Sequence, residues 1–301
     1  MSAICNIMCD STCDFTAEQA AERNVTILPF HYIEAGKPDG GLCGDDDLFQ
    51  SRCAHDFYDA IRNGAAPMTS QPSQLEYDEA FKAAYESGVP TVMFCISSGI
   101  SGGYNGAVAS LDRLKEAHPG EEVRIYVVDT LIASTALTLL LNEACNKRDA
   151  GASAEDIVAW AEEARFRVRV MFMVENLDAL HRGGRIPKGV AVVGDALGVK
   201  PMLHFNLDGT LGICGVARGR KKGLRKLVEH YKKNVVHGDE ANVVAVGDAD
   251  VPEDGFNVAA ELRAFDETLE VLRPTIGPTI GSHVGPGMVS CVFWGKDRRE
   301  G

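Results

Sequence analysis

The segment that decides the fold class is TVMFCISSGISGGYNGAVASLDRLKEA, which spans residues 91–117. Its first six residues form a short apolar run that is typical of a buried strand. Residues 97–103 follow as a turn of hydroxyl-bearing and glycine residues, and residues 106–117 have the apolar spacing of a helix. A strand, a turn and a helix in this order predict an α/β fold.

The same pattern recurs through the first half of the chain. Expected strands span residues 3–8, 25–30, 91–96 and 124–128, and expected helices span residues 49–62, 74–86, 106–117 and 132–147. A further helix is expected after Thr16, where Gln19 three residues later completes a capping-box pattern. This alternation of strands and helices predicts a mainly parallel sheet sandwiched by helices.

A different pattern begins after residue 147. Ser153 caps an expected helix to about residue 167, a strand spans residues 170–174, and Asp208 and Gly209 mark a hairpin within residues 205–214. Helix and strand pairs are expected at 223–234 with 243–246 and at 258–265 with 269–272, and a last strand spans 288–294. We therefore expect a parallel α/β/α domain over residues 1–160 and a mixed α/β domain over residues 161–301. Residues 34–47 are expected to form a long surface loop.

Composition and charge exclude several classes of protein. The 301 residues are 45% hydrophobic, which suffices for a folded core, and the formal net charge of −13 disfavours nucleic acid as a partner. No apolar run reaches the roughly 18 residues of a membrane-spanning helix, and the N-terminus has no signal-peptide pattern. The nine cysteines form no CxxC pair and predict reduced thiols in a cytoplasmic protein. We expect neither a metal nor a cofactor.

Hydroxyl and glycine residues cluster where the expected strands end and the expected helices begin. These clusters are residues 10–12, 69–73, 97–103 and 129–130. Open α/β sheets bind ligands at the carboxyl ends of their strands, helix N-termini favour anions, and hydroxyls donate to a carboxylate without adding charge. Ordinary caps and turns use the same residue types, so both interpretations stay open.

Three basic residues in the second half have two interpretations each. Arg185 follows two glycines, where its guanidinium could clamp an acidic group or bond the carbonyls of a capping turn. His283 lies in the glycine-rich residues 281–287, which we expect to form a loop, and it is a candidate ligand or acid–base group or else a core residue. Arg218 begins a basic run to residue 226 that is either a solvated helix start or a docking patch for an acidic partner.

Residues 99–103 match the G-x-S-x-G pattern of a nucleophile elbow. Ser101 would be the nucleophile, and the order Ser101, then Asp248 or Asp250, then His283 fits the triad of an α/β-hydrolase. The alternative function is therefore a serine esterase or hydrolase. A third interpretation is a module that binds a small anion or phosphosugar in a shallow polar pocket.

Six motifs in order carry a resemblance to a known family. They are CDSTCD at residues 9–14, TSQPS at 69–73, SSGISG at 97–102, GGRI at 183–186, GVKP at 198–201 and IGSHVGPG at 280–287. Together they resemble the DegV family of bacterial proteins, the fatty acid-binding proteins that serve fatty acid kinase. The resemblance covers about residues 4–294.

This resemblance implies a carrier and co-substrate of a separate kinase, with no catalytic residue of its own. A long-chain fatty acid of the palmitate or oleate class would lie in a buried apolar tunnel, with its carboxylate at the domain junction. The residues implied to bind that carboxylate are Thr69, Ser70, Ser97, Ser98 and Gly99. Arg185 and His283 would lie beside the head group, Arg218 would contribute to kinase docking, and transient contact with a membrane surface is expected. Two features depart from the family pattern: Gly247–Asp248 replaces a histidine, and residues 40–55 are rich in cysteine and aspartate.

Overall fold

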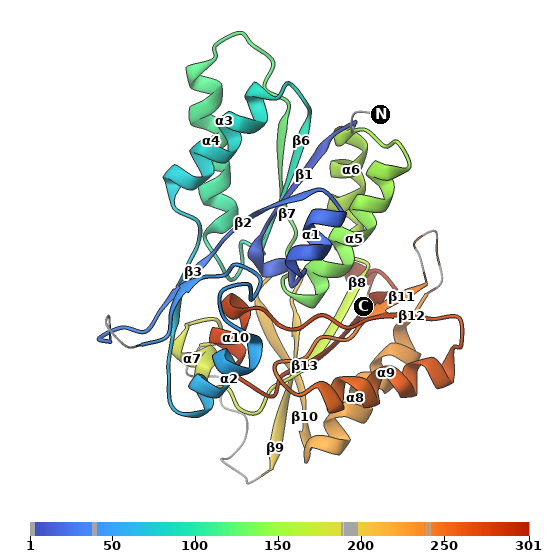
Figure 1. The fold of residues 1–301 in the computed structure, drawn as a ribbon. Helices are drawn as coiled ribbons and strands as arrows, with labels where there is room; N and C mark the ends of the chain where they lie inside the picture. Colours follow the sequence, from blue (N-terminus) through green and yellow to red (C-terminus); the bar gives the residue numbers. More distant parts are fainter. Residues whose placement is uncertain are drawn as a thin grey trace.

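The computed structural model describes residues 4–37, 41–187, 189, 198–236, 238, 240 and 242–300, which form three β-sheets with helices packed around them (Figure 1). Sheet A has the order β2 (Val25–Leu28), β1 (Asn6–Asp10), β6 (Thr91–Cys95) and β7 (Ile125–Asp129). All its strand pairs are parallel. This arrangement confirms the mainly parallel sheet that the strand–helix alternation predicts.

Helices cover both faces of sheet A. On one side α3 (Gln74–Glu86) packs beside α4 (Gly103–Ala117), and on the other lie α1 (Ala17–Glu22), α5 (Thr135–Asp149) and α6 (Ala154–Ala164) (Figure 1). The capping box of Thr16 and Gln19 is present at the start of α1. Most residues of α5 are buried, because this helix also packs against β8, β11 and β13 of a second sheet.

Sheet C is the second sheet and is mixed. Its order is β10 (Leu211–Arg218), β9 (Val199–Phe205), β8 (Val168–Met173), β13 (Val289–Trp294), β11 (Val243–Ala245) and β12 (Glu270–Leu272). β11 and β12 are parallel, and the other pairs are antiparallel. α8 (Arg220–Asn234) and α9 (Pro252–Phe265) pack on this sheet, so the mixed α/β character expected of the second half is confirmed. The division near residue 160 remains a prediction; α6 packs on β7 of sheet A, and β8 of sheet C begins at Val168.

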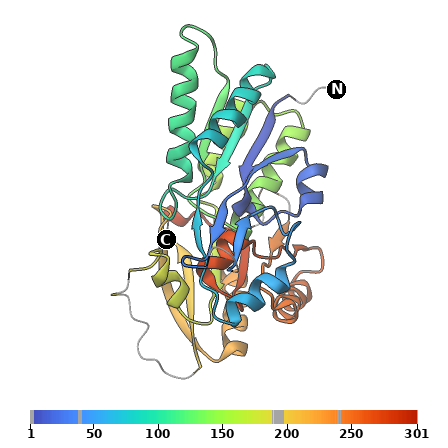
Figure 2. The ribbon, with the colours of Figure 1, turned by 60° about the vertical axis from the view of Figure 1, so that its left-hand side comes forward.

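A third, small sheet, sheet B, is formed by the first half of the chain and contacts α10 (Pro278–Val284) of the second half. It consists of β4 (Cys43–Asp45), β3 (His31–Ile33) and β5 (Met68–Ser70), all antiparallel. The helices α2 (Ala54–Arg62) and α10 pack against each other, and α10 also packs on β3, β5 and the short helix α7 (Asp178–Arg182). Figure 2 shows α10 beside α2 although the two helices lie far apart in the sequence. Two 3-10 helices, η1 (Ser11–Cys13) and η2 (Arg298–Glu300), complete the fold.

Three expectations about local structure are wrong. Residues 34–47 are not simply a surface loop, because their described part contains β4 and the side chains of Leu42 and Asp46 are buried. The helix expected at residue 49 begins at Ala54, since Leu48 and Phe49 both have a φ of 61° that no helix accepts. His283 lies on a helix and not in a loop, because Pro278 starts α10 at its first turn and Gly285 ends it with a φ of 72°.

No helix within the described residues is long and apolar enough to cross a membrane.

Candidate ligand-binding site

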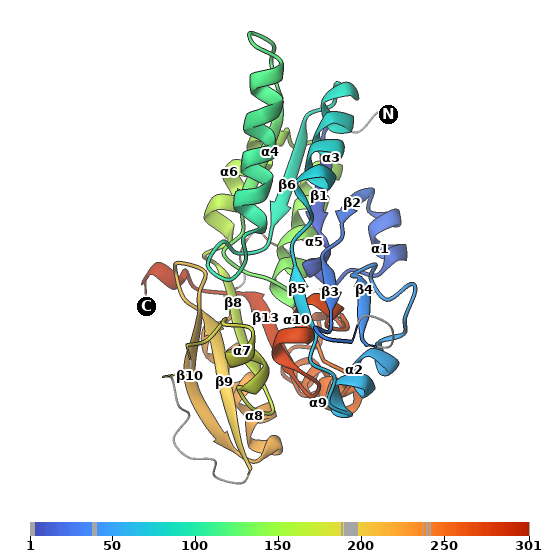
Figure 3. The same cartoon turned by 90° about the vertical axis from the view of Figure 1, so that its left-hand side faces the viewer.

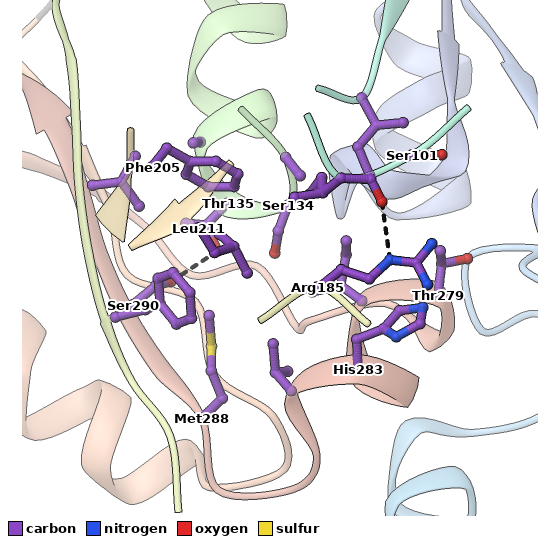
Figure 4. A pocket seen from close by; sticks show the side chains of 18 of the residues that line it. Ser101, Ser134, Thr135, Arg185, Phe205, Leu211, Thr279, His283, Met288 and Ser290 are labelled. Atoms are coloured by element: carbon purple, nitrogen blue, oxygen red, sulfur yellow. Dashed lines mark hydrogen bonds between the residues drawn. The ribbon is translucent and has the colours of Figure 1, made fainter. Parts of the chain in front are cut away.

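A cavity lies where sheet A, sheet C and α10 meet (Figure 4). Most of its lining is apolar: Phe30, Ile96, Ile100, Ala133, Ala136, Val170, Phe172, Leu180, Phe205, Leu211, Ile280, Val284, Met288 and Val292. The polar lining residues are Thr69, Ser101, Ser134, Thr135, Arg185, Thr279, His283 and Ser290. A mainly apolar cavity with a few polar groups does not fit the shallow polar pocket of a small-anion module.

The polar residues are not spread evenly. Ser101, Arg185, Thr279 and His283 lie on one side of the cavity, and Phe205 and Leu211 lie on the opposite side (Figure 4). Oγ1 of Thr69, on β5, lies 2.8 Å from Nε2 of His283 on α10, so this residue joins the same polar side. The basic side chains of the lining therefore gather at one end of the cavity. The side of Phe205 and Leu211 is mainly apolar, and there the hydroxyl of Ser290 donates to that of Thr135 over 2.9 Å (Figure 4).

Arg185 is held in place by backbone carbonyls alone. Its Nε donates to the carbonyl of Ile100 over 2.9 Å and its Nη1 donates to the carbonyl of Gly183 over 2.6 Å. Burial lowers the pKa of this guanidinium, and no carboxylate of the described residues forms an ion pair with it. A half-buried cation without a counter-ion is energetically unfavourable, so this end of the cavity favours an anionic group of a ligand. Both interpretations of Arg185 are thus compatible, since it bonds carbonyls and still offers a free charge.

His283 is neutral in this environment. Burial first, and then the positive charges of Arg185 and Arg182, together lower its pKa to about 3. Its Nε2 bonds Thr69, and its Nδ1 is buried without a hydrogen-bond partner in the part of the chain that the structure describes. A neutral imidazole can donate to or accept from a ligand without adding a second charge.

Gly183 and Gly184 allow Arg185 and His283 to lie at the cavity. Gly184 has a φ of 73°, which turns the chain back after α7, so that Arg185 reaches the cavity. A Cβ on Gly183 would lie only 2.2 Å from Nδ1 of His283. The imidazole therefore occupies space that any other residue at position 183 would fill.

The hydroxyl-rich turn after β6 is only partly at the cavity. Ser97 Oγ donates to the carbonyl of Gly209 over 2.8 Å, and Ser98 Oγ donates to Oδ2 of Asp129 over 2.5 Å. Neither serine, nor Gly99, nor Ser70 on β5, is among the lining residues. Their role in carboxylate binding therefore stays a prediction, while Thr69, Arg185 and His283 do line the cavity.

Ser101 is the hydroxyl of this turn that lines the cavity. Its Oγ accepts from the amide of Gly103 over 3.2 Å, and no hydrogen bond among the described residues uses its own proton. The sequence singles out Ser101 only as a possible nucleophile. Ser101 is the last hydroxyl of the turn, two residues before α4 begins at Gly103, and this position is the signal in the sequence for a ligand-binding role.

The hydrolase triad is not assembled. Asp248 bonds Arg273 over 3.0 Å, and Asp250 bonds Arg62 over 2.5 Å. His283 bonds Thr69, and within the described ranges no carboxylate reaches it. An activated serine needs a hydrogen bond to a histidine, and that histidine needs a carboxylate that orients it. Neither contact is present at Ser101 in the described part of the chain, so this serine lacks the geometry of a catalytic nucleophile.

Arg218 lies at the exposed end of β10, just before the basic first turn of α8. The neighbouring Arg220 is neutralised by Glu175 and Asp254, and Lys200 also bonds Glu175. A docking role of Arg218 stays a prediction. All nine cysteines carry free thiols, and the described residues contain no group of His, Cys, Asp or Glu suited to hold a metal ion.

Comparison with known proteins gives the family. A model of the DegV family matches residues 5–296. The chain belongs to the DegV family. A DegV domain-containing protein of Clostridium perfringens, CPE0026, is 34% identical over 242 residues, which cover 80% of this chain and 82% of that relative.

Solved structures of DegV proteins have the same fold. A stearic acid-binding protein from Eubacterium ventriosum superposes with a TM-score of 0.81 at 26% identity, covering 98% of this chain and 99% of that one. The fatty acid kinase B3 protein of Streptococcus pneumoniae, loaded with linoleic acid, superposes with a TM-score of 0.80 over 97% and 99% of the two chains. At 19% identity this second likeness shows the fold alone.

Proposed function

We propose that this DegV protein binds one long-chain fatty acid and presents its carboxyl group to a separate fatty acid kinase. The observation that carries the proposal is the half-buried guanidinium of Arg185, which has no carboxylate partner among the described residues and lies at one end of a mainly apolar cavity. One negative charge and one long apolar tail complement that arrangement.

The head group would be held by four side chains. Arg185 supplies the charge, Thr69 and Ser101 supply hydroxyls, and the neutral His283 supplies a ring nitrogen. A hydrogen bond to a charged group contributes about 1.5–3 kcal/mol. Burying a methylene contributes roughly 0.8 kcal/mol, so a tail of about sixteen carbons gains on the order of 10 kcal/mol before ordering costs. The tail therefore sets the affinity and the polar end sets the orientation.

Relatives support a lipid ligand. The Eubacterium ventriosum structure is of a stearic acid-binding protein, and the pneumococcal relative belongs by its name to a fatty acid kinase and was loaded with linoleic acid. For this chain we extend the inference to a carrier that acts as co-substrate in the cytoplasm, takes palmitate- or oleate-class acids, needs no cofactor and contacts membranes transiently. Arg218 would contact the kinase, and the loop of Ser97, Ser98 and Gly99 with Ser70 would flank the exposed carboxyl group.

The decisive experiment is to purify the chain after expression in bacteria, denature it and identify co-released lipid by mass spectrometry. We expect stoichiometric fatty acid of the palmitate or oleate class. Absence of lipid, together with no uptake of added oleate or palmitate by the delipidated protein, would refute the proposal. An exposed cation, such as Lys115 on α4, provides the matched control, because Lys115→Gln should leave the lipid content unchanged while Arg185→Gln lowers it.

The esterase alternative makes a different prediction. It requires turnover of ester substrates and covalent labelling of Ser101 by a fluorophosphonate. Because the described residues contain no carboxylate that orients His283, we expect neither result.

A further inference from the structure

The β9–β10 hairpin supplies one wall of the cavity. Phe205 is the last residue of β9, Leu211 is the first residue of β10, and the two are directly paired across the hairpin. Both side chains line the cavity, on the side away from Arg185 and His283 (Figure 4). A ligand whose carboxylate is bound at Arg185 therefore directs its tail toward this pair or past it.

Few residue pairs join this hairpin to β8 of sheet C, and α8 packs on both of its strands. β9 pairs with β10 through seven residue pairs, but with β8 only through Phe172 with Leu203 and Met173 with Met202. β10 is the edge strand, and its register is interrupted between Ile213 and Gly215. Figure 3 shows the two strands as a long arm at the side of the molecule. Beyond Leu203, the position of the hairpin depends on the contacts made at its turn, which we call the hairpin tip.

Two contacts from opposite directions hold the tip. Ser97, in the turn after β6, donates to the carbonyl of Gly209 over 2.8 Å, and both groups are buried. Arg298, in the C-terminal η2, donates through Nη1 to the carbonyl of Phe205 over 2.9 Å and through Nη2 to the carbonyl of Arg165 over 3.1 Å. Arg298 is partly buried, and this burial lowers the pKa of its guanidinium to about 10.

Gly99 completes the fit of the tip. A Cβ at this position would lie 2.5 Å from the carbonyl carbon of Gly209 and 2.6 Å from the amide nitrogen of Thr210. Both are backbone atoms and cannot rotate away. The backbone of the hairpin turn therefore rests directly on the backbone of Gly99, and the glycine at this position is explained by packing.

We propose that Phe205 and Leu211 determine the acyl-chain length that the cavity accepts, and that Ser97, Gly99 and Arg298 position these two side chains by fixing the hairpin tip. The inference rests on the proposed function, because it assumes a fatty acid bound with its carboxylate at Arg185. Phe205 and Leu211 are specificity-determining residues in this view, and the effect of the other three on chain length passes through them.

The test is a competition of saturated fatty acids of increasing length for the delipidated protein, read out by mass spectrometry of the bound fraction. Phe205→Ala and Leu211→Ala should shift the preferred chain to a longer acid, and Leu211→Phe should shift it to a shorter one. Ile213→Ala is the matched control: it lies on the same strand, outside the cavity lining, and should leave the length profile unchanged.

The positioning residues are tested with the same readout. Ser97→Ala and Gly99→Ala should broaden the length profile, because a displaced tip no longer holds Phe205 and Leu211 in one place, whereas a change in stability alone would lower occupancy without altering the profile. If the wild-type chain binds no fatty acid, the proposed function fails. If it binds fatty acid and the substitutions at 205 and 211 that remain folded leave the preferred length unchanged, this inference alone fails. Leu211→Phe adds volume rather than a void, so it keeps the test open if the alanine variants do not fold.

Discussion

Nε2 of His283 lies 2.8 Å from Oγ1 of Thr69, although the two residues are 214 positions apart in the chain. Thr69 belongs to the small sheet B, and His283 belongs to α10, which follows β12 of sheet C. Their contact brings two distant segments of the chain together at one point of the cavity wall. The polar end of the site is thus built from two halves that fold as separate sheets, and the ligand head group would lie where they meet.

Arg185→Gln should weaken carboxylate recognition and leave tail binding largely intact. The substitution removes the charge but retains an amide N–H near the position of Nε, which donates to the carbonyl of Ile100. Loss of a charge-assisted hydrogen bond corresponds to about 1.5–3 kcal/mol, or roughly a ten- to hundredfold increase in Kd for oleate. Isothermal titration with oleate and with methyl oleate checks this, because the ester carries no charge for Arg185 to bind.

The Kd of methyl oleate should be the same for the wild type and for Arg185→Gln. A similar loss for both ligands would mean that Arg185 supports the cavity walls rather than the head group.

Gly183→Ala should displace the imidazole of His283. The added Cβ would lie 2.2 Å from Nδ1, so the ring must move away from its present position. We expect a clear loss of kinase-dependent acyl-phosphate formation with a smaller loss of bound lipid, since the tail contacts are untouched. Gly184 is unsuitable as a control, because its φ of 73° makes any substitution strained. Val284→Ala, which trims the apolar lining next to His283, should instead lower lipid retention first.

The elements of the parallel sheet could be predicted from sequence because each is encoded locally. The run at residues 91–96 is apolar on both faces, as a central parallel strand requires, and α3 has the predicted bounds because Ser73 and Glu76 form a capping box at its start. The hairpin between β9 and β10 was likewise signalled by Asp208 and Gly209, and Gly209 has the φ of 77° that such a turn needs.

Sheet B and α10 were missed because their stability comes from tertiary contacts. β3, β4 and β5 have three residues each, too few for a periodic signal, and Asp46 is buried only because the amide of Thr279 on α10 donates to it over 3.0 Å. His283 was assigned to a loop for the same reason, since glycines surround it in sequence. Thr69, Arg185 and His283 can be named from the sequence motifs that contain them, but which serine of the turn faces the cavity depends on the hairpin that packs on Gly99.

Serines 98 and 101 should therefore behave differently. Ser98 is engaged with Asp129 through both its Oγ and its amide, whereas Ser101 lines the cavity with a free hydroxyl proton. In the presence of the kinase, Ser101→Ala combined with Thr69→Ala should cut acyl-phosphate formation more than it cuts lipid retention, which a paired phosphorylation and lipid-extraction assay can measure. Ser98→Ala with Thr69→Ala provides the comparison. An equal effect of the two double variants would place Ser98 at the head group as well, as the family resemblance implies.

Two buried aspartates should make stability depend on pH. Burial raises the pKa of Asp14 to about 7 and of Asp46 to about 6, and for Asp14 the neighbouring charge of Asp46 acts in the same direction. Hydrogen bonds from Ser134 and the amide of Gly277 to Asp14 oppose this rise without cancelling it. The folded chain therefore holds these protons up to a higher pH than the unfolded chain does.

The direction in which stability changes with pH follows from the number of protons that each state binds. Between about pH 4 and pH 7 the folded state binds more protons than the unfolded state at these two sites, so their contribution to the free energy of unfolding falls as the pH rises. Asp14→Asn, which keeps an acceptor for Gly277 and removes the charge, should gain stability relative to wild type on going from pH 5 to pH 8, by on the order of a few kcal/mol. Urea unfolding at several pH values measures the difference, and taking variant minus wild type cancels groups that titrate in both proteins. Asp47→Asn, at a less buried neighbouring position, serves as control and should give a flat difference. A difference for Asp14→Asn that is equally flat, or that rises toward acid pH, would show that Asp14 is ionised in the folded protein throughout this range.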